Sequence, residues 1–413
     1  MVYDALIVGG GASGLIAACE LARLGRRVAL LEKQDRVGRK LLSTGNGRCN
    51  LTNLRAGTGD YHGDRQAAQA ALRAWPPERI AAYFASIGLP CDADGAGRVY
   101  PMSRQAASVL DALRLFCDEK GVQARTGFAV SKLSSCPEGF LARAADGRTA
   151  KGKTALVCTG GLAAPKLGAC GDGYGLLESF GHRISSRFPA IAALKTPPEA
   201  VRALKGIRAE GEAALLGDGV LQRAERGEIL FAEYGVSGIA AMQLARRANE
   251  LLRAGRKCEI RLNFAPEWAS AEAELAARAT ALPRRGMGDF LTGIVPRRLG
   301  EALVKAAQLD HAAPAGTLTR RDCRALAAQL TGWTLPVLGT QGYDQAQVTA
   351  GGASLKDFDI RAMQSLRTPG LFAAGEVLDV DGDCGGFNLQ WAWSSALIAA
   401  RGIDARLAGA TPE

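Results

Sequence analysis

Residues 5–14 of this chain read Ala5-Leu6-Ile7-Val8-Gly9-Gly10-Gly11-Ala12-Ser13-Gly14. The apolar run is short and bounded by glycine, which predicts a buried strand of a parallel sheet. The glycines at 9, 11 and 14 match the G-x-G-x-x-G spacing of a dinucleotide-binding loop. In such a loop the pyrophosphate lies at the N-terminus of the following helix, where backbone N–H groups and the helix dipole favour negative charge.

The next segments complete a strand–helix–strand unit. Residues 15–24 have helical periodicity and end at Gly25, and residues 26–31 predict a second strand that ends at Glu32. A carboxylate about 20 residues beyond the glycines accepts hydrogen bonds from the hydroxyls of the adenosine ribose. Because it would repel a 2′-phosphate, residues 1–32 predict a site for FAD or NAD and disfavour NADP.

The chain has 413 residues, which suggests about two or three domains. Hydrophobic residues make up 47% and charged residues 22%, as in an ordinary globular enzyme with a large core. No apolar run reaches the length of about 18 residues that a membrane-spanning helix needs. The first apolar run is short and leads directly into the glycine loop. We therefore expect neither a membrane span nor a signal peptide, and a cytoplasmic location.

Cysteine, histidine and net charge exclude several classes of function. The ten cysteines form no C-x-x-C pair, and His62, His182 and His311 are far apart, so we expect reduced thiols and no metal site. The formal net charge is +10, but the arginines are spread along the chain without a basic run. A solvated, arginine-rich surface is favoured, and we expect no nucleic-acid partner.

The pattern of the sequence divides the chain into four parts. Short strands and turns fill residues 186–264, and alanine- and leucine-rich helical segments broken by prolines fill residues 265–335. Residues 336–413 return to the strand and glycine pattern of residues 1–185. We predict an α/β fold in which a Rossmann-like nucleotide-binding domain is assembled from both chain ends, with an inserted β-rich subdomain and an inserted helical subdomain.

A single G-x-G-x-x-G loop follows a predicted strand. Thr159-Gly160-Gly161 follows the apolar run 154–158 but lacks the spacing, so one dinucleotide is held stably and NAD(P)H would be a transient electron donor. Near the C-terminus, the apolar run 371–374 leads into Gly375-Glu376, with Asp379 shortly after. A late strand that delivers an acid to the ribitol and its phosphate is typical of flavoproteins, which favours FAD.

The segment Gly38-Arg39-Lys40-Leu41-Leu42-Ser43-Thr44-Gly45-Asn46-Gly47-Arg48-Cys49-Asn50 resembles the signature of a bacterial flavoprotein family. That family includes aminoacetone oxidase and BaiN-type NAD(P)/FAD-dependent oxidoreductases. Residues 228–238, 348–352 and 375–393 agree with the same family, so the resemblance covers essentially the whole chain. It implies an FAD-binding domain made from both termini with two inserted subdomains. It leaves the substrate open, because the activities of the members differ.

Two segments are candidates to surround the isoalloxazine ring. Gly385-Gly386-Phe387-Asn388 precedes a predicted helix, whose positive end would stabilise the charge that gathers on the ring upon reduction. A plain helix cap, with Asn388 as N-cap, is the alternative. The loop 44–48 can wrap the pyrophosphate–ribitol stretch and cross one face of the ring. Arg39 and Lys40 neutralise phosphate, bind an anionic substrate group, or remain solvated charges.

The resemblance alone implies that Val130 lies near the adenine and Thr159-Gly160-Gly161 near the nucleotide. Trp391 and Trp393 are expected in the core. Cys49 and Cys384 lie inside cofactor motifs, where small buried side chains are favoured over a redox-active thiol pair. The residues predicted to bind the cofactor are Gly9, Gly11, Ala12, Ser13, Gly14, Glu32, Lys33, Arg39, Lys40, Thr44, Gly45, Asn46, Gly47, Arg48, Cys49, Asn50, Val130, Thr159, Gly160, Gly161, Gly375, Glu376, Asp379, Gly386, Phe387, Asn388 and Leu389.

The sequence points to an FAD-dependent oxidoreductase and names no catalytic residue. Its flavin would take a hydride from a small-molecule donor or NAD(P)H and pass electrons to dioxygen or an unsaturated acceptor. An oxidase of a small amino-ketone and a nicotinamide-driven reductase of a conjugated ketone are the two versions. A flavin-binding redox sensor without turnover is the alternative, and flavin-dependent modification of nucleic acid is a third class. The oligomeric state stays open.

Overall fold

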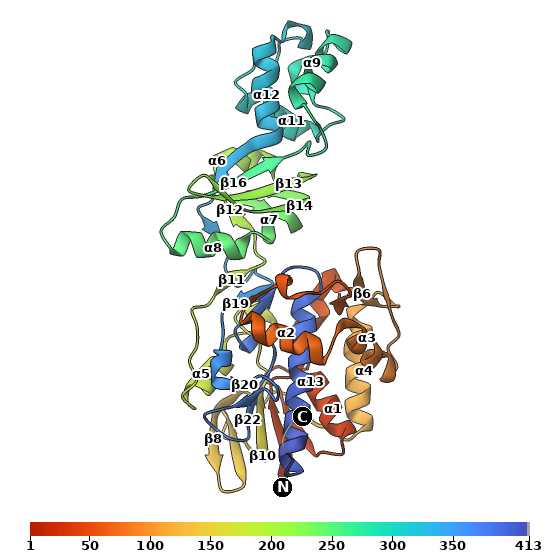
Figure 1. Ribbon diagram of the computed structural model, residues 1–413, viewed down its shortest axis with the longest axis vertical. Helices are drawn as coiled ribbons and strands as arrows, with labels where there is room; N and C mark the ends of the chain where they lie inside the picture. Colours follow the sequence, from red (N-terminus) through yellow and green to blue (C-terminus); the bar gives the residue numbers. More distant parts are fainter. Residues whose placement is uncertain (411–413) are drawn as a thin grey trace. The chain divides into compact units, whose positions relative to one another are not determined.

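The computed structural model describes residues 1–410. The chain forms two compact units, one made of Met1–Phe188 with Gln347–Glu413 and the other of Pro189–Ala346. Figure 1 shows the first unit with red and blue segments together, so the two ends of the chain share one fold. The sequence placed its outer boundaries at 185/186 and 335/336, and the further division into β-rich and helical subdomains stays a prediction.

The first unit is built on a mainly parallel sheet. Strand β1 (Val2–Val8) pairs in parallel with β2 (Val28–Leu31) on one side and with β10 (Thr149–Val157) on the other. Strand β22 (Leu371–Ala373), from the C-terminal part, pairs in parallel with β10, and β7 (Gln123–Arg125) pairs in parallel with β2. The order β22-β10-β1-β2-β7 confirms the predicted Rossmann-like sheet assembled from both chain ends.

Apolar strands and apolar helices make the core of this unit. All residues of β1 after Val2 are buried, as expected for a strand covered on both faces. Helix α1 (Ala12–Arg23) buries ten of its twelve residues, and it packs beside the long helix α13 (Phe387–Leu407), as Figure 1 shows. The close packing of α1 on α13 joins the N-terminal and C-terminal segments directly.

Shorter elements surround this core. Strands β3, β6 and β5 form a small antiparallel sheet, and β4 pairs with β23. Strands β8 and β9 form a hairpin that continues the main sheet from β10, and β20 and β21 extend the sheet beyond β22. Their bounds are β3 Thr52–Asn53, β4 Tyr61–Gly63, β5 Cys91–Ala93, β6 Arg98–Pro101, β8 Val130–Cys136, β9 Gly139–Ala144, β20 Phe358–Asp359, β21 Gln364–Ser365, β23 Val380–Gly382, α2 Arg65–Ala74, α3 Pro77–Ser86, α4 Ala106–Glu119 and α5 Asp172–Glu178.

The second unit contains a seven-stranded sheet in the order β17-β16-β13-β14-β15-β12-β18, with antiparallel neighbours. The helices α9 to α12 lie in the sequence between β16 and β17, so the sheet takes strands from both sides of the helical stretch. The bounds are β12 Leu194–Lys195, β13 Arg208–Gly217, β14 Val220–Ala232, β15 Gly235–Ser237, β16 Cys258–Asn263, β17 Trp333–Pro336, β18 Gly339–Thr340, α6 Pro198–Val201, α7 Ile239–Met242, α8 Ala245–Arg253, α9 Ala271–Ala281, α10 Met287–Phe290, α11 Arg297–Ala306 and α12 Arg320–Gly332.

Two short strands, β11 (Phe188–Ala190) and β19 (Val348–Ala350), lie where the chain leaves the first unit and returns to it. Within residues 1–410, every helix is too short or too polar to cross a membrane.

Candidate active site

The N-terminal glycine loop requires glycine at two positions, 9 and 14. Gly9 has φ +106°, a conformation that glycine tolerates and other residues rarely adopt. A Cβ on Gly14 would lie against the carbonyl oxygen of Gly9, closer than any real contact, so α1 can approach the loop this closely only with glycine at position 14. A Cβ on Gly11 would meet no atom within 4 Å, and no side chain caps α1. Open space therefore faces the uncapped N-terminus of α1, as a pyrophosphate requires.

The carboxylate of Glu32 is held against this loop. Its Oε2 accepts a hydrogen bond from the N–H of Gly10 and its Oε1 accepts one from the N–H of Gln34, both at 2.8 Å. The half-buried carboxylate is therefore fixed at the end of β2, beside the glycine loop. A carboxylate has further lone pairs that can accept from hydroxyl groups, and the contact of Glu32 with a ribose stays a prediction.

The side chains of Lys33 and Arg39 are bonded to other side chains of the protein, and Val130 lies in a strand pair. The Lys33 ammonium pairs with the Asp172 carboxylate at 2.5 Å. Burial lowers the pKa of Lys33, but the hydrogen bond that Lys33 donates to Asp172 outweighs this and the pKa is raised. Arg39 donates to the side-chain oxygen of Gln34 at 2.6 Å, and Val130 begins β8 opposite Ala144. Their contact with a cofactor stays a prediction.

Lys40, Gly161 and Glu376 are brought together, although they are far apart in the sequence. Lys40 Nζ lies 2.7 Å from Oε2 of Glu376, and the other oxygen of Glu376 accepts from the N–H of Thr349 at 2.9 Å. A Cβ on Gly161 would lie 2.5 Å from the hydroxyl of Thr349 and 3.0 Å from Glu376. Sequence reasoning missed Thr349, which lies in a segment used only for the family resemblance.

The turn at Gly375 meets the glycine loop from the other end of the chain. A Cβ on Gly375, which has φ +79°, would collide with the hydroxyl of Ser13. The N–H of Gly375 donates to Ser395 Oγ at 3.0 Å, and its carbonyl accepts from the indole N–H of Trp391 at 3.1 Å. Asp379 lies in the next turn, where its carbonyl accepts from the N–H of Asp64. The two predicted cofactor segments are therefore in direct contact.

The loop that carries the family signature has an unusual backbone. Gly45, Asn46, Gly47 and Cys49 all have positive φ, between 53° and 82°. The thiol of Cys49 is fully buried, and burial raises its pKa to about 12. Burial also raises the pKa of Cys384. Both thiols are therefore protonated at neutral pH, which disfavours redox chemistry at these cysteines.

The N-terminus of α13 faces the signature loop. The helix begins after Gly386, without a side-chain cap, and a Cβ on Gly386 would lie 2.9 Å from Asn50 Oδ1. The side chain of Asn388 bonds to the backbone N–H and C=O of Gly382, so the alternative in which Asn388 is the N-cap is wrong. The first-turn N–H groups of Phe387, Asn388 and Leu389 have no acceptor within the helix.

Helix α13 also holds the backbone that follows the signature loop. The indole N–H of Trp393 donates to the carbonyl of Leu51 at 3.0 Å. Thr52 Oγ1 donates to the side-chain oxygen of Gln390 at 2.6 Å, and the Gln390 amide donates to the carbonyl of Trp75. Trp391 and Trp393 are both buried, as expected, and their N–H groups also bond to the backbone of segments that are predicted to hold the cofactor.

These features together fit FAD. The side-chain oxygens of Asn50 and Thr159 are buried and have no hydrogen-bond partner, although both residues belong to the predicted site. Thr159 lies directly beside the glycine loop, because a Cβ on Gly9 would be 3.0 Å from its Cα. Two uncapped helix N-termini, an open space at Gly11 and two unsatisfied oxygens match a ligand with phosphates, hydroxyls and ring N–H groups.

A histidine–aspartate pair lies in the turn before α13. His62 Nε2 is 2.9 Å from Asp383 Oδ1, and both side chains are mostly buried. The pairing of β4 with β23 places them together across 321 residues of sequence. Histidine spacing alone carried no signal for this pair, so sequence reasoning missed it.

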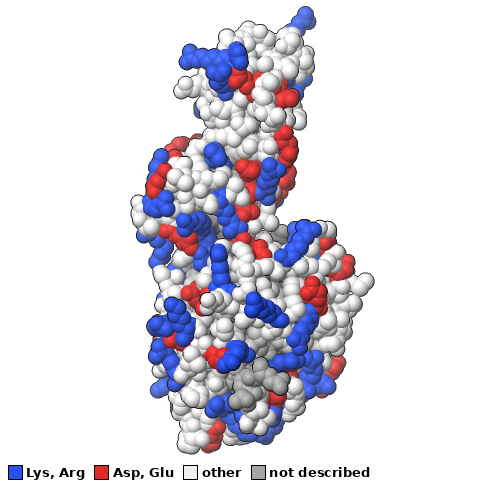
Figure 2. Space-filling view, in the orientation of Figure 1, with Lys and Arg blue, Asp and Glu red and all other residues white. Residues whose placement is uncertain are grey.

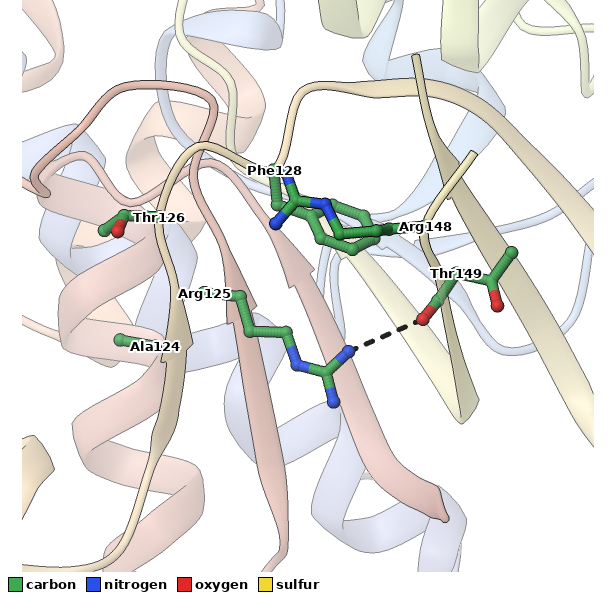
Figure 3. Close-up of a pocket in the computed structure, with 6 residues that line it drawn as sticks. All are labelled: Ala124, Arg125, Thr126, Phe128, Arg148 and Thr149. Carbon is green, nitrogen blue, oxygen red and sulfur yellow. Dashed lines mark hydrogen bonds between the residues drawn. The ribbon is translucent and has the colours of Figure 1, made fainter. Parts of the chain in front are cut away.

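A pocket of about 520 Å³ adjoins the end of β2 that carries Glu32. In Figure 3, Arg125 reaches from β7 toward the carbonyl of Thr149, and the Arg148 guanidinium lies over the ring of Phe128. The N–H of Phe128 donates to the carbonyl of Glu32 at 2.8 Å. The pocket is lined by Ala124, Arg125, Thr126, Phe128, Arg148 and Thr149, none of which was predicted to bind the cofactor.

Comparison with known proteins identifies the family. Residues 3–402 match the model described as the HI0933-like protein Rossmann domain. The chain belongs to the HI0933-like family. It is 36% identical to the 3-dehydro-bile acid delta(4,6)-reductase of Clostridium scindens, over 97% of this chain and 98% of that protein. It is 31% identical to the ribosomal RNA dihydrouridine synthase of Escherichia coli, over 98% of each.

The fold of this HI0933-like protein is also found among solved structures. The 3-ketosteroid delta1-dehydrogenase of Sterolibacterium denitrificans superposes with a TM-score of 0.52 at 13% identity, covering 98% of this chain and all of that one. The family match and the site geometry make the chain an FAD-dependent oxidoreductase.

Proposed function

We propose that this HI0933-like protein is a reductase that adds a hydride and a proton across a carbon–carbon double bond conjugated to a carbonyl group. The support is the full-length relative at 36% identity that is named as a delta(4,6)-reductase of a 3-dehydro bile acid. A dihydrouridine synthase also adds hydrogen to a ring double bond conjugated to a carbonyl. The shared reaction type favours the reductase over the oxidase of an amino-ketone.

The chain's own residues have roles that fit this reaction. Bound FAD supplies the two-electron chemistry. The uncapped N-terminus of α13 stabilises negative charge on the pyrimidine edge of the ring. Gly11 and the N-terminus of α1 receive the pyrophosphate, Glu32 the adenosine ribose, and Glu376 with Lys40 the ribitol–phosphate end. His62, paired with Asp383, is a candidate to hold a proton near the helix.

NAD(P)H is the proposed electron donor. The glycine loop at residues 9–14 is the single dinucleotide fingerprint, and FAD occupies it in this proposal. A nicotinamide cofactor would therefore bind transiently and leave before the unsaturated substrate enters. Small-molecule substrates are proposed in preference to RNA, because Figure 2 shows Lys and Arg interspersed with Asp and Glu over the face drawn.

Anaerobic reduction of the purified protein tests the proposal. The flavin absorbance should bleach with NADH or NADPH and return upon addition of a conjugated enone, with a product two mass units heavier than the substrate. The matched saturated ketone should not restore the absorbance. Bleaching by small amines, followed by peroxide formation in air, would support the oxidase instead. A flavin that neither donor bleaches would support the redox sensor without turnover.

A further inference from the structure

Arg48 carries a positive charge that the protein does not neutralise. It lies in the signature loop, its side chain is exposed, and its guanidinium carbon is 5.6 Å from the centre of the Tyr100 ring. Within residues 1–410 it forms no ion pair with a carboxylate. When a guanidinium lies over an aromatic face, its N–H groups point outward in the plane of the guanidinium itself. They are then free to donate to a planar acceptor.

A second arginine at the same aromatic ring, Arg104, differs from Arg48 because it has a carboxylate partner. Arg104 also lies over Tyr100, with its guanidinium carbon 5.0 Å from the ring centre, but it donates to the Asp92 carboxylate at 2.8 Å. Tyr100 is 6% exposed and belongs to β6, so it is a fixed platform for both guanidinium groups. One of the two cations is therefore neutralised within the protein, whereas Arg48 has no carboxylate partner among the described residues.

Arg48 lies in the sequence close to the residues that meet the N-terminus of α13, where the reacting ring of the cofactor is expected. Two residues later, the Asn50 side chain lies against Gly386, at the N-terminus of α13. Trp393 fixes the next carbonyl, that of Leu51, so the loop is rigid on this side. The flavin phosphates are expected at the other uncapped helix, α1, where Gly11 leaves open space. Arg48 therefore lies in the part of the signature loop that is next to α13, two residues before Asn50.

We propose that Arg48 binds a carboxylate on the substrate, so that the preferred substrates are conjugated carbonyl compounds that carry an anionic group. The inference rests on the proposed reductase function and specifies its substrate class. Arginine suits this role because its planar fork matches the two oxygens of a carboxylate. The left-handed backbone at Asn46 and Cys49 costs free energy, as is common where a loop positions a binding group.

The test compares an acid with its neutral ester on the FAD-loaded enzyme. A 3-keto-4-ene steroid with a side-chain carboxylate and its methyl ester are the two probes. Arg48→Gln should raise KM and the dissociation constant for the acid by roughly tenfold to a hundredfold, and those for the ester by a much smaller factor. Higher ionic strength should weaken binding of the acid to the wild type and not to the variant. Dissociation constants are measured by the change in flavin absorbance, without turnover.

Three further variants separate recognition from structure. Arg55→Gln removes another exposed arginine near the small sheet and should discriminate acid from ester as the wild type does. Tyr100→Phe should keep the preference for the acid because the aromatic face remains, whereas Tyr100→Leu should weaken it. The melting temperature and bound FAD are measured for each variant.

Several outcomes would overturn the inference. One is an equal effect of Arg48→Gln on acid and ester. Another is loss of FAD from that variant, which would make Arg48 a cofactor ligand. A third is Arg48-dependent binding of a uridine-containing RNA oligonucleotide without binding of the acid. If the wild type binds the acid through Arg48 but reduces neither probe, the proposed reductase function fails while the anion site stands.

Discussion

The two segments predicted to hold FAD are built by different means. The N-terminal loop at Gly9 to Gly14 depends mainly on close contacts between backbone atoms at Gly9 and Gly14, and one side chain, that of Glu32, is bonded to Gly10. The C-terminal turn at Gly375 and the start of α13 are held by side chains instead, those of Trp391, Ser395 and Asn388. Steric fit therefore matters most in the first half of the site, and buried hydrogen bonds matter most in the second.

This difference predicts how each half responds to substitution. Where backbone atoms are in close contact, one added methyl group should cause a large loss of stability, because the backbone can move aside only at a high cost in free energy. A hydrogen-bonded segment should lose stability in steps, one unsatisfied group at a time.

The largest effect is expected at Gly14. Gly14→Ala places a methyl group against the carbonyl of Gly9 and should force α1 away from β1. We expect a loss of about 3 kcal/mol or more in the free energy of unfolding and a protein without bound flavin. Urea unfolding and the flavin absorbance of the purified protein measure the two effects.

The matched control is Gly11→Ala. No atom lies within 4 Å of a Cβ there, so the free energy of unfolding of the apoprotein should hardly change. FAD binding should nevertheless be lost, because the methyl group fills the space of the pyrophosphate. A Gly11→Ala protein that keeps its flavin would show that the pyrophosphate lies elsewhere.

The hydrogen-bonded half is tested at Gln390. Gln390→Ala leaves the Thr52 hydroxyl and the Trp75 carbonyl buried without this partner, which should cost about 1–3 kcal/mol in the free energy of unfolding. FAD should bind more weakly without being lost. Ser394→Ala, which removes a bond within α13 itself, is the control and should cost less. Equal costs for the two variants would contradict the role of Gln390 in joining distant segments.

A smaller effect should depend on pH. Burial alone would raise the pKa of Asp357, but hydrogen bonds from Arg183 and Arg367 outweigh it and hold the pKa well below its usual range. Because the folded-state pKa is lowered, the stabilisation is complete above the unfolded-state pKa of about 3.9 and is lost as the pH falls below it. The difference in unfolding free energy between wild type and Asp357→Asn should therefore shrink from pH 5 to pH 3.

Urea unfolding across that pH range measures the difference. Asp359→Asn, whose partner Arg361 is largely exposed, is the control and should change little over the range. A difference for Asp357→Asn that stays constant with pH would contradict a lowered pKa. Asp357 and Arg183 join the C-terminal and N-terminal parts of the first unit. This ion pair is therefore another side-chain contact that holds the two ends of the chain together.

The smallest effect is expected at Cys49. Its buried thiol, with a pKa raised to about 12, should resist iodoacetamide at pH 8, whereas the exposed Cys170 should react. Mass spectrometry of the labelled peptides separates the two sites. Rapid labelling of Cys49 in the folded protein would show that the signature loop opens.

Much of the first unit was predictable because its signals are local. The strand, the three glycines, α1 and Glu32 follow one another within 32 residues, so their spacing alone predicts the β–α–β unit. The resemblance of residues 38–50 added the signature loop. Neither source indicated that Thr349 would contact Glu376, or that His62 would pair with Asp383, because nothing in the local sequence of either residue specifies its partner.

The sequence by itself determined the dinucleotide loop and the apolar strands, because glycine spacing and apolar periodicity act over a few residues. The return of the same pattern near the C-terminus, together with the family resemblance, predicted that the two chain ends share one Rossmann-like sheet, and the structure confirms it. Tertiary structure alone decided which side chains share the site: Lys40 with Glu376, Ser13 with Gly375, and Asn50 with Gly386. These contacts depend on how β22 and α13 pack against β10 and α1, and such packing is set by the shape of the whole core.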